Sequence, residues 1–145
     1  MPSELRKPDE ASVEIKRYYN LYHFKDLVLM HRLQESRIAD ILEEETVPAY
    51  GWIAYNGSIP VAAGFLRLIE GGYAQIDTLV SNPTTPSVVR HKAISQIVNN
   101  CVEDARWMRL KGIVSYTRDE SVLKRAIAIG FQAMPDIVIS LNLGA

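Results

Sequence analysis

The sequence is poor in three features, each of which would point to a particular class of protein. It has a single cysteine, Cys101, which excludes a disulfide framework. It has no apolar run of about 18 residues, the length that a transmembrane helix needs, so no membrane partner is expected. Its 16 Lys and Arg residues are balanced by 17 Asp and Glu residues, so the charge gives no reason to expect a nucleic-acid partner.

A metal site is equally unsupported. The histidines His23, His31 and His91 are scattered along the chain. None of them has cysteine or acidic neighbours at the spacing of a metal-ligand set. Cys101 lies among the apolar residues of a predicted helix. A reactive thiolate needs an exposed, electropositive setting, so none is expected there.

What is present is the composition of a soluble globular protein. The chain has 145 residues, of which 48% are hydrophobic, enough for one domain with a substantial core. Residues 1–12 are mostly polar and contain two prolines, so they are predicted to form a tail. Residues 13–145 are predicted to form the domain. The polar N-terminus lacks the apolar segment of a secretory signal, which favours a cytoplasmic location.

Hydrophobic periodicity predicts the secondary structure. Strands are predicted at residues 13–19, 50–55, 59–69, 73–80, 113–117 and 137–143. The pair Asn56-Gly57 is the usual signal of a tight hairpin turn. Helices are predicted along an apolar stripe from Phe24 to Leu33, over a short segment that Ser36 can cap, and from Asp119 to Gly130.

The stretch from Tyr73 to Gly112 organises the rest of the chain. A short apolar strand leads through polar turn residues into a long helix, which Gly112 is predicted to end. One face of that helix carries apolar residues three and four positions apart: Ile94, Ile97, Val98, Cys101, Val102, Ala105 and Met108. A turn between a strand and a helix places free backbone N–H groups at the positive end of the helix dipole, where an anion can bind.

The order of these elements predicts the fold class. Antiparallel strands come first, and a strand–helix–strand crossover with parallel strands follows. The predicted fold is therefore α/β, with a mixed and mostly antiparallel sheet and helices on both faces.

Three segments together are similar to the GNAT superfamily of acyl-CoA-dependent N-acetyltransferases. Residues 76–80 (Ile-Asp-Thr-Leu-Val) resemble the family's fourth strand. Residues 90–95 (Arg-His-Lys-Ala-Ile-Ser) occupy the place of its Arg/Gln-x-x-Gly-x-Gly/Ala pyrophosphate motif. Residues 119–131 match a segment near its C-terminus that closes on Gly-Phe. The resemblance spans residues 13–143 and implies a single GNAT-like domain.

The resemblance also implies a ligand set. The co-substrate would be acetyl-CoA, the acceptor an amine on a small molecule or a protein, and no metal would take part. Backbone groups of Leu79, Val80 and Ser81 would bind the pantetheine arm. The remaining cofactor-binding residues implied by the resemblance, mostly around the pyrophosphate, are Arg90, His91, Lys92, Ala93, Ser95 and Asp119.

The catalytic positions depart from the family's pattern. Glycine in the pyrophosphate motif lets the backbone approach the phosphates, but His91, Ala93 and Ser95 stand where glycine is common. The family's general acid, a tyrosine, falls on Ala126, which cannot protonate a leaving thiolate. Tyr116 is the nearest substitute by sequence. Asp77 is the candidate general base, acting directly or through water if burial raises its pKa.

Two starts of the long helix are compatible with the sequence. Thr85 can cap a helix whose first residue is Pro86, and the N–H groups of Ala93 to Ser95 would then donate within the helix. If the helix begins near His91 instead, the usual pyrophosphate site survives, with Arg90 and Lys92 as charge partners. The apolar face from Ile94 onward fits both starts.

Three functions follow from these observations. The first is acyl transfer from CoA to a primary amine by direct attack on the thioester, which needs positioning, an oxyanion donor and proton removal. The second is a GNAT-like domain without catalysis that serves as a structural or interaction component, for example in a phage virion or its host's cytoplasm. The third is an acyl-CoA sensor without turnover. Free N–H groups at residues 90–95 would favour the first or third function. The resemblance also implies a homodimer or protein assembly, formed through residues 137–143.

Overall fold

The computed structural model describes residues 12–36, 39, 42–117, 119–137, 139–141 and 143. The chain divides into two compact units, Met1–Ser115 and Tyr116–Ala145. In chain order the elements are β1 (Glu14–Arg17), α1 (Asn20–Leu33), η3 (Glu44–Thr46), β2 (Tyr50–Asn56), β3 (Ile59–Ile69), β4 (Tyr73–Ser81), α2 (Ser87–Trp107), β5 (Gly112–Val114) and α3 (Glu120–Ala128). All but α3 belong to the first unit.

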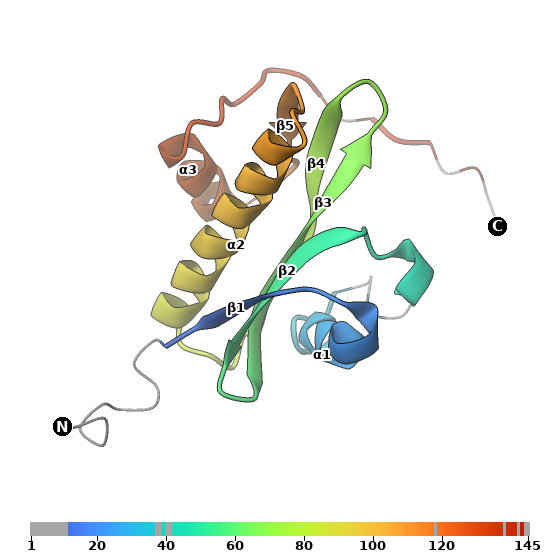
Figure 1. Cartoon of the computed structure of the whole chain (residues 1–145). Coiled ribbons are helices and arrows are strands. Elements are labelled where there is room, and N and C mark those ends of the chain that lie inside the picture. Colours follow the sequence, from blue (N-terminus) through green and yellow to red (C-terminus); the bar gives the residue numbers. More distant parts are fainter. Residues whose placement is uncertain are drawn as a thin grey trace. The chain divides into compact units, whose positions relative to one another are not determined.

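The strands form one mixed sheet in the order β1-β2-β3-β4-β5 (Figure 1). The pairs from β1 to β4 are antiparallel. β5 pairs with β4 in parallel after the crossover through α2. The predicted fold class, with its antiparallel meander and parallel strand–helix–strand crossover, is therefore confirmed.

The helices α1 and α2 cover opposite faces of this sheet, as Figure 1 shows. On one face, Leu27 and Met30 of α1 share a buried cluster with Phe65 of β3. On the other face, Gly64 lies under α2, where an added Cβ would come within 2.9 Å of Ile97 Cγ2. The alternation of side chains along β3 thus assigns one face to each helix.

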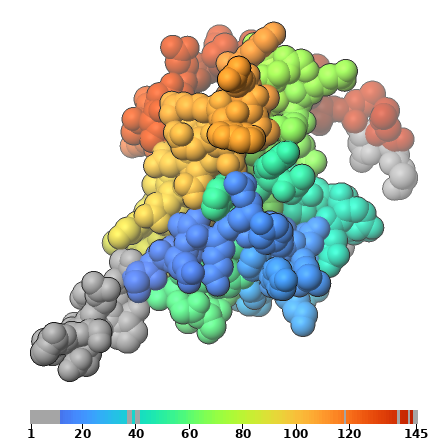
Figure 2. Space-filling view, viewed as in Figure 1, coloured from blue at the N-terminus to red at the C-terminus, as the bar shows by residue number. Residues whose placement is uncertain are grey.

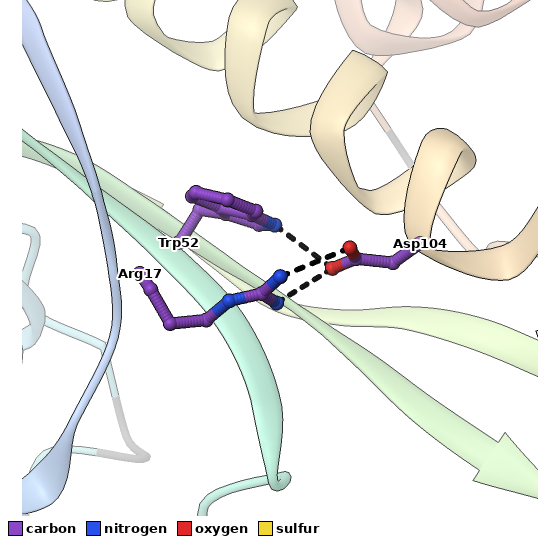
Figure 3. A network of polar contacts seen from close by, with 3 residues as sticks. All are labelled: Arg17, Trp52 and Asp104. Atoms are coloured by element: carbon purple, nitrogen blue, oxygen red, sulfur yellow. Dashed lines mark hydrogen bonds and ion pairs between the residues drawn. The ribbon is translucent and has the colours of Figure 1, made fainter. Parts of the chain in front are cut away.

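A polar network of Arg17, Trp52 and Asp104 connects α2 to the β1 edge of the sheet (Figure 3). Arg17 of β1 donates two hydrogen bonds to Asp104 of α2, of 2.7 and 3.1 Å. The indole N–H of Trp52 donates to the same carboxylate at 3.0 Å, and the Arg17 guanidinium lies 4.0 Å from the Trp52 ring centroid. The hydrogen bond to Asp104 raises the pKa of Arg17. Figure 2 shows β1, in blue, beside α2, in yellow and orange.

The end of α2 was predicted wrongly. The helix ends at Trp107, not at Gly112. Arg109 adopts the left-handed conformation with φ of 59°. The N–H of Arg109 donates to Arg106 and that of Leu110 donates to Ala105, which is the Schellman arrangement. Gly112 instead begins β5. The prediction failed because a residue other than glycine can also supply the positive φ that ends a helix.

The C-terminal strand expected at residues 137–143 is also absent from the described residues of that stretch, which form no strand. Ile137, Ile139, Leu141 and Leu143 are between 81% and 90% exposed. Alternation alone cannot make a strand, because its backbone groups need a neighbouring strand to pair with. The short helix expected after Ser36 and the tail expected over residues 1–12 lie largely outside the described residues.

Candidate functional site

The two parallel strands of the sheet pair over a short distance and then separate. β4 pairs with β5 only at Tyr73, Ala74 and Gln75, opposite Gly112–Val114. β4 itself continues to Ser81. Within the described residues, no strand pairs with the rest of β4 on that side. An unpaired strand edge presents backbone N–H and C=O groups that an extended ligand can use.

A β-bulge lies in the unpaired part of β4. Ala63 is opposite Val80 and Phe65 is opposite Asp77, so the residues Thr78 and Leu79 together face Gly64 of β3. Thr78 has φ of 53°, a left-handed conformation that is rare for a β-branched residue. Bulges and strained backbone are concentrated at functional sites. The bulge therefore marks this part of β4 as the candidate site.

The surroundings of the bulge require a glycine on the neighbouring strand. A Cβ added at Gly64 would come within 2.9 Å of Leu79 Cδ1 and of Ile97 Cγ2. Contacts of that length displace one of the partners. The absence of a side chain at Gly64 thus lets the bulged Leu79 and α2 pack over the same strand.

Asp77, the predicted general base, is engaged on both of its carboxylate oxygens. Its Oδ1 accepts a hydrogen bond of 2.7 Å from the N–H of Thr78. Its Oδ2 accepts one of 2.6 Å from Nε of Arg67 on β3. The Arg67 guanidinium also donates to the carbonyl oxygen of Thr46 in η3 at 3.1 Å. Arg67 belongs to no motif in the sequence, and its place across the hairpin from Asp77 is the one signal that could have identified it.

The turn from β4 into α2 is built around a buried asparagine. Asn82 Oδ1 accepts hydrogen bonds from the N–H and hydroxyl of Thr84, at 2.9 and 2.7 Å. Asn82 Nδ2 donates to the Pro60 carbonyl oxygen at 2.9 Å, and the Thr85 hydroxyl donates to the Asn82 carbonyl oxygen at 2.7 Å. The Asn-Pro pair signalled a turn in the sequence, but did not reveal that the side chain organises it.

The start of α2 decides between the two sequence interpretations. The helix begins at Ser87, after Pro86, one residue later than the earlier of the two predicted starts. The N–H of Arg90 donates to the Pro86 carbonyl oxygen at 3.1 Å. From Arg90 onward the N–H groups therefore bond within the helix, and those of Ser87, Val88 and Val89 precede its first hydrogen bond. The free end of the helix dipole lies about one turn before the predicted motif.

The predicted pyrophosphate residues have different surroundings. Ala93 is fully buried, whereas His91 and Lys92 are exposed and Ser95 is half-buried. Arg90 is half-buried, and its Nε has no hydrogen-bond partner among the described residues. Because the backbone N–H groups of this segment are used by the helix, its predicted role in binding now rests on side chains and stays a prediction.

The segment predicted to bind the pantetheine arm can act only through its backbone at two of its three positions. The side chains of Val80 and Ser81 are buried, and that of Leu79 is half-buried. The predicted role of these residues required backbone hydrogen bonds rather than side chains, so their burial is compatible with it. The role itself stays a prediction.

Residues 116–145, the second unit, contain the two remaining predicted site residues. Tyr116 is 62% exposed, and its proposed role as an acid stays a prediction. Asp119 caps α3, accepting from the N–H of Ser121 at 2.8 Å and from its hydroxyl at 2.7 Å. These hydrogen bonds lower the pKa of Asp119. The predicted cap is confirmed, and it gives Asp119 a structural explanation.

The Gly-Phe pair that supported the family resemblance also has a structural role. Gly130 has φ of 109°, and its N–H donates to the Ile127 carbonyl oxygen. The N–H of Phe131 donates to the Ala126 carbonyl oxygen at 3.0 Å. Together these bonds form the Schellman motif that ends α3, as the sequence predicted.

Among the described residues, the other chemically reactive side chains do not form a second site. Cys101 is buried, and burial raises the pKa of its thiol to about 12, which disfavours the reactive thiolate form. The described residues contain no group of three or more His, Cys, Asp or Glu side chains that could hold a metal ion. In the part of the chain that the structure describes, no helix is both long and apolar enough to cross a membrane.

No protein-family model and no curated protein matches the sequence. Solved structures, however, match the fold. A GNAT-family acetyltransferase from Streptococcus pneumoniae matches with a TM-score of 0.71 and 13% identity, over 91% of this chain and 99% of that one. An aminoglycoside acetyltransferase from an uncultured soil metagenomic sample, in complex with sisomicin, matches with a TM-score of 0.70 and 12% identity, over 92% and 97%.

A third structure, AAC(6')-Iy in complex with the bisubstrate analogue CoA-S-monomethyl-acetylneamine, matches with a TM-score of 0.68 and 10% identity. It covers 91% of this chain and 99% of its own. At these identities the likeness establishes the fold. The chain has the GNAT fold.

Proposed function

We propose that this protein transfers an acyl group from acyl-CoA to a primary amine. The proposal is carried by one combination of features: the bulged, unpaired stretch of β4 leads directly to the free N-terminus of α2. The first can bind an extended ligand with amide groups, and the second can bind an anion. Acyl-CoA has both, since its pantetheine arm carries amides and ends at a pyrophosphate.

In this proposal the pantetheine arm extends the sheet along β4. Its amides pair with backbone groups of Leu79, Val80 and Ser81, on the edge that β5 leaves open. The burial of the Val80 and Ser81 side chains anchors this backbone in the core, so it is held in place before the ligand arrives. A preorganised strand edge loses little conformational freedom on binding.

The pyrophosphate then lies at the N–H groups of Ser87, Val88 and Val89, about one turn before the segment expected from the sequence. These groups lie at the positive end of the helix dipole. Arg90, whose Nε is unpaired among the described residues, adds a positive charge in the next turn. No glycine is present here, so Cβ atoms limit how closely the phosphates approach. We therefore expect weaker binding than a glycine-rich turn would give.

The reaction is a direct attack. The lone pair of the neutral amine forms a bond to the thioester carbon, the C–S bond breaks, the nitrogen loses one proton to a base or to water, and the CoA thiolate takes up one proton from an acid or from water. The demand on side chains is modest because positioning supplies much of the rate. Asp77 and Tyr116 remain the candidates for proton transfer, although both Asp77 oxygens already accept hydrogen bonds.

The structural neighbours suggest which acceptors to test first. One of them is an aminoglycoside acetyltransferase bound to sisomicin, so small polyamines and aminoglycosides lead the panel, followed by peptides with a free amine. The chain's own acceptor, a cytoplasmic or virion location, and a homodimer or larger assembly are further parts of this proposal that need separate tests.

A second candidate function is favoured by two observations. The N–H groups from Arg90 onward bond within α2, so the backbone that the family motif would offer to a pyrophosphate is occupied. Ala126 likewise replaces the expected acid. A GNAT-like interaction component that binds no acyl-CoA would tolerate both changes, whereas an acyl-CoA sensor would tolerate only the loss of the acid.

Calorimetric titration with acetyl-CoA tests the proposal. Ser87→Pro removes one N–H group at the first position of α2, where proline is tolerated, while Ser87→Ala keeps that N–H group and removes the hydroxyl. We expect Ser87→Pro to weaken binding about tenfold or more relative to Ser87→Ala, because a hydrogen bond to a charged group is lost.

Acyl transfer is then measured as release of the CoA thiol in the presence of the amine panel. Binding of acetyl-CoA without release of the CoA thiol would show that the protein is an acyl-CoA sensor rather than an enzyme. Absence of binding at millimolar acetyl-CoA would exclude both the enzyme and the sensor, and an interaction component would be the remaining function.

A further inference from the structure

The left-handed backbone at Thr78 needs something to hold it in place. A β-branched residue avoids this conformation because its Cβ crowds the following carbonyl group. The hydrogen bond from the Thr78 N–H to Asp77 Oδ1, at 2.7 Å, gives this N–H a partner outside the strand ladder. The carboxylate of Asp77 therefore holds the bulge from the position directly before it.

Arg67 holds that carboxylate in turn. Arg67 pairs with Gln75 across the two strands, so it lies diagonally opposite Asp77 on the same face of the sheet. A diagonal neighbour is within reach of a long side chain. Nε of Arg67 donates to Asp77 Oδ2 at 2.6 Å, which leaves Oδ1 directed at the Thr78 N–H.

The same guanidinium reaches a third element. The NH2 group of Arg67 donates to the Thr46 carbonyl oxygen at 3.1 Å. Thr46 belongs to a compact turn, in which its hydroxyl donates to the Glu43 carbonyl oxygen at 2.8 Å. Arg67 therefore connects the segment between α1 and β2 to the bulge in β4.

We infer that Arg67 is a positioning residue for the proposed acyl transfer, acting through Asp77 to fix the backbone at Thr78 and Leu79. This inference rests on the proposed function. It assigns Asp77 to holding the bulge rather than to accepting the proton of the amine. Each carboxylate oxygen accepts one hydrogen bond in that role, so proton transfer to Asp77 would have to use a remaining lone pair of an oxygen that already holds the bulge or Arg67.

The pair is suited to positioning rather than to general stabilisation. The Arg67 and Asp77 side chains are 45% and 30% exposed, and ion pairs of that exposure contribute little to stability. Loss of the pair should therefore leave the protein folded and change the local backbone. This makes the inference testable with variants that fold.

The experiment compares Asp77→Ala, Asp77→Asn and Arg67→Gln in the full chain. Asp77→Asn keeps an oxygen for the Thr78 N–H, whereas Asp77→Ala does not. Arg106→Gln, which breaks the exposed ion pair with Glu103 on α2, is the matched control. The first readout is hydrogen exchange at the Thr78 amide, measured without ligand. We expect about tenfold faster exchange in Asp77→Ala, a smaller change in Asp77→Asn and Arg67→Gln, and none in Arg106→Gln.

The second readout is the split between kcat and KM. A positioning role predicts that Arg67→Gln lowers kcat about tenfold or more with little change in the KM for acetyl-CoA, and that Asp77→Asn retains more activity than Asp77→Ala. Equal losses in the two Asp77 variants, with Arg67→Gln fully active, would mean that Asp77 is the base and would overturn the inference.

Failure of the inference is distinguishable from failure of the proposed function. Thr78 exchange that is unchanged in Asp77→Ala overturns the inference whether or not the protein is an enzyme. A wild-type protein that neither binds acetyl-CoA nor releases thiol overturns the proposed function, and with it the catalytic part of the inference, even where Thr78 exchange responds as expected.

Discussion

Two arginine–aspartate pairs lie on opposite faces of the same sheet, and they differ in their number of hydrogen bonds and in their exposure to solvent. Arg17 forms a bidentate ion pair with Asp104, whose carboxylate also accepts a hydrogen bond from the Trp52 indole N–H. The side chains of Arg17 and Asp104 are 34% and 18% exposed. Arg67 and Asp77 share one hydrogen bond and are 45% and 30% exposed.

The difference shows that the same two residue types can serve two purposes. The first pair joins β1 to α2, elements that are far apart in the sequence, so it stabilises the fold. The second pair connects neighbouring strands that already pair through their backbones, so it adds little to the fold. Its distinct contribution is to hold the strained residue Thr78.

The largest expected difference between the two pairs is in the free energy of unfolding that is lost when the aspartate is removed. Asp104→Ala should lower the free energy of unfolding by about 2–3 kcal/mol, because it leaves a half-buried guanidinium and an indole N–H without an acceptor. Asp77→Ala should cost about 1 kcal/mol or less. Urea unfolding of both variants gives the two values. Similar losses would show that the two pairs do not differ in purpose.

A smaller effect should appear at the bulge itself. Thr78→Gly should raise the free energy of unfolding by about 1 kcal/mol, because glycine adopts the left-handed conformation without the penalty of a Cβ. Thr78→Ala keeps the Cβ and should not stabilise the protein. Thermal unfolding of the two variants checks the prediction. Stabilisation by alanine as well would attribute the effect to the threonine side chain rather than to backbone strain.

The smallest expected effect is the dependence of stability on acid, and it concerns the buried histidine His31 rather than either of the two charged pairs. Neither ring nitrogen of His31 has a hydrogen-bond partner among the described residues, and burial lowers the pKa of its imidazole. The unfolded chain, with a histidine pKa of about 6.5, then binds a proton that the folded protein does not. Stability should therefore fall as the pH drops below about 6.5.

The variant His31→Leu should lose less stability than the wild type between about pH 7 and pH 5, as followed by urea unfolding at each pH. His91→Leu, a change at an exposed histidine, serves as the control. An unchanged pH dependence in His31→Leu would place the acid sensitivity elsewhere, for example at His23, whose pKa burial also lowers.

Much of the fold could be predicted because local signals agreed with the global arrangement. Asn56-Gly57 marks the β2–β3 hairpin, Asp119 and Gly130 bracket α3, and apolar spacing marks α2. The predictions were wrong where a signal was not unique. Arg109 takes the left-handed conformation that was assigned to Gly112, and the described residues of the alternating stretch 137–143 pair with no strand that the structure describes.

The candidate site was predicted less completely because its geometry depends on contacts between elements. The sequence places Asp77 on a strand, but the bulge arises from the register between β3 and β4. The start of α2 was ambiguous because the predicted apolar face begins at Ile94. Val89 is in fact the first buried residue of the helix. Recognising Val89 and Ala93 as part of the stripe would have indicated the earlier start.

The short contact between β4 and β5 also has a consequence for the order in which the protein folds and opens. The strands β2, β3 and β4 are joined by short turns and can pair early, whereas β5 must wait for the whole of α2 to be placed. Only three residue pairs then hold it. The end of the sheet that forms last should therefore open most often in the native protein. A ligand that lies between the two strands would close that opening, so binding there would slow the most frequent fluctuation of the sheet.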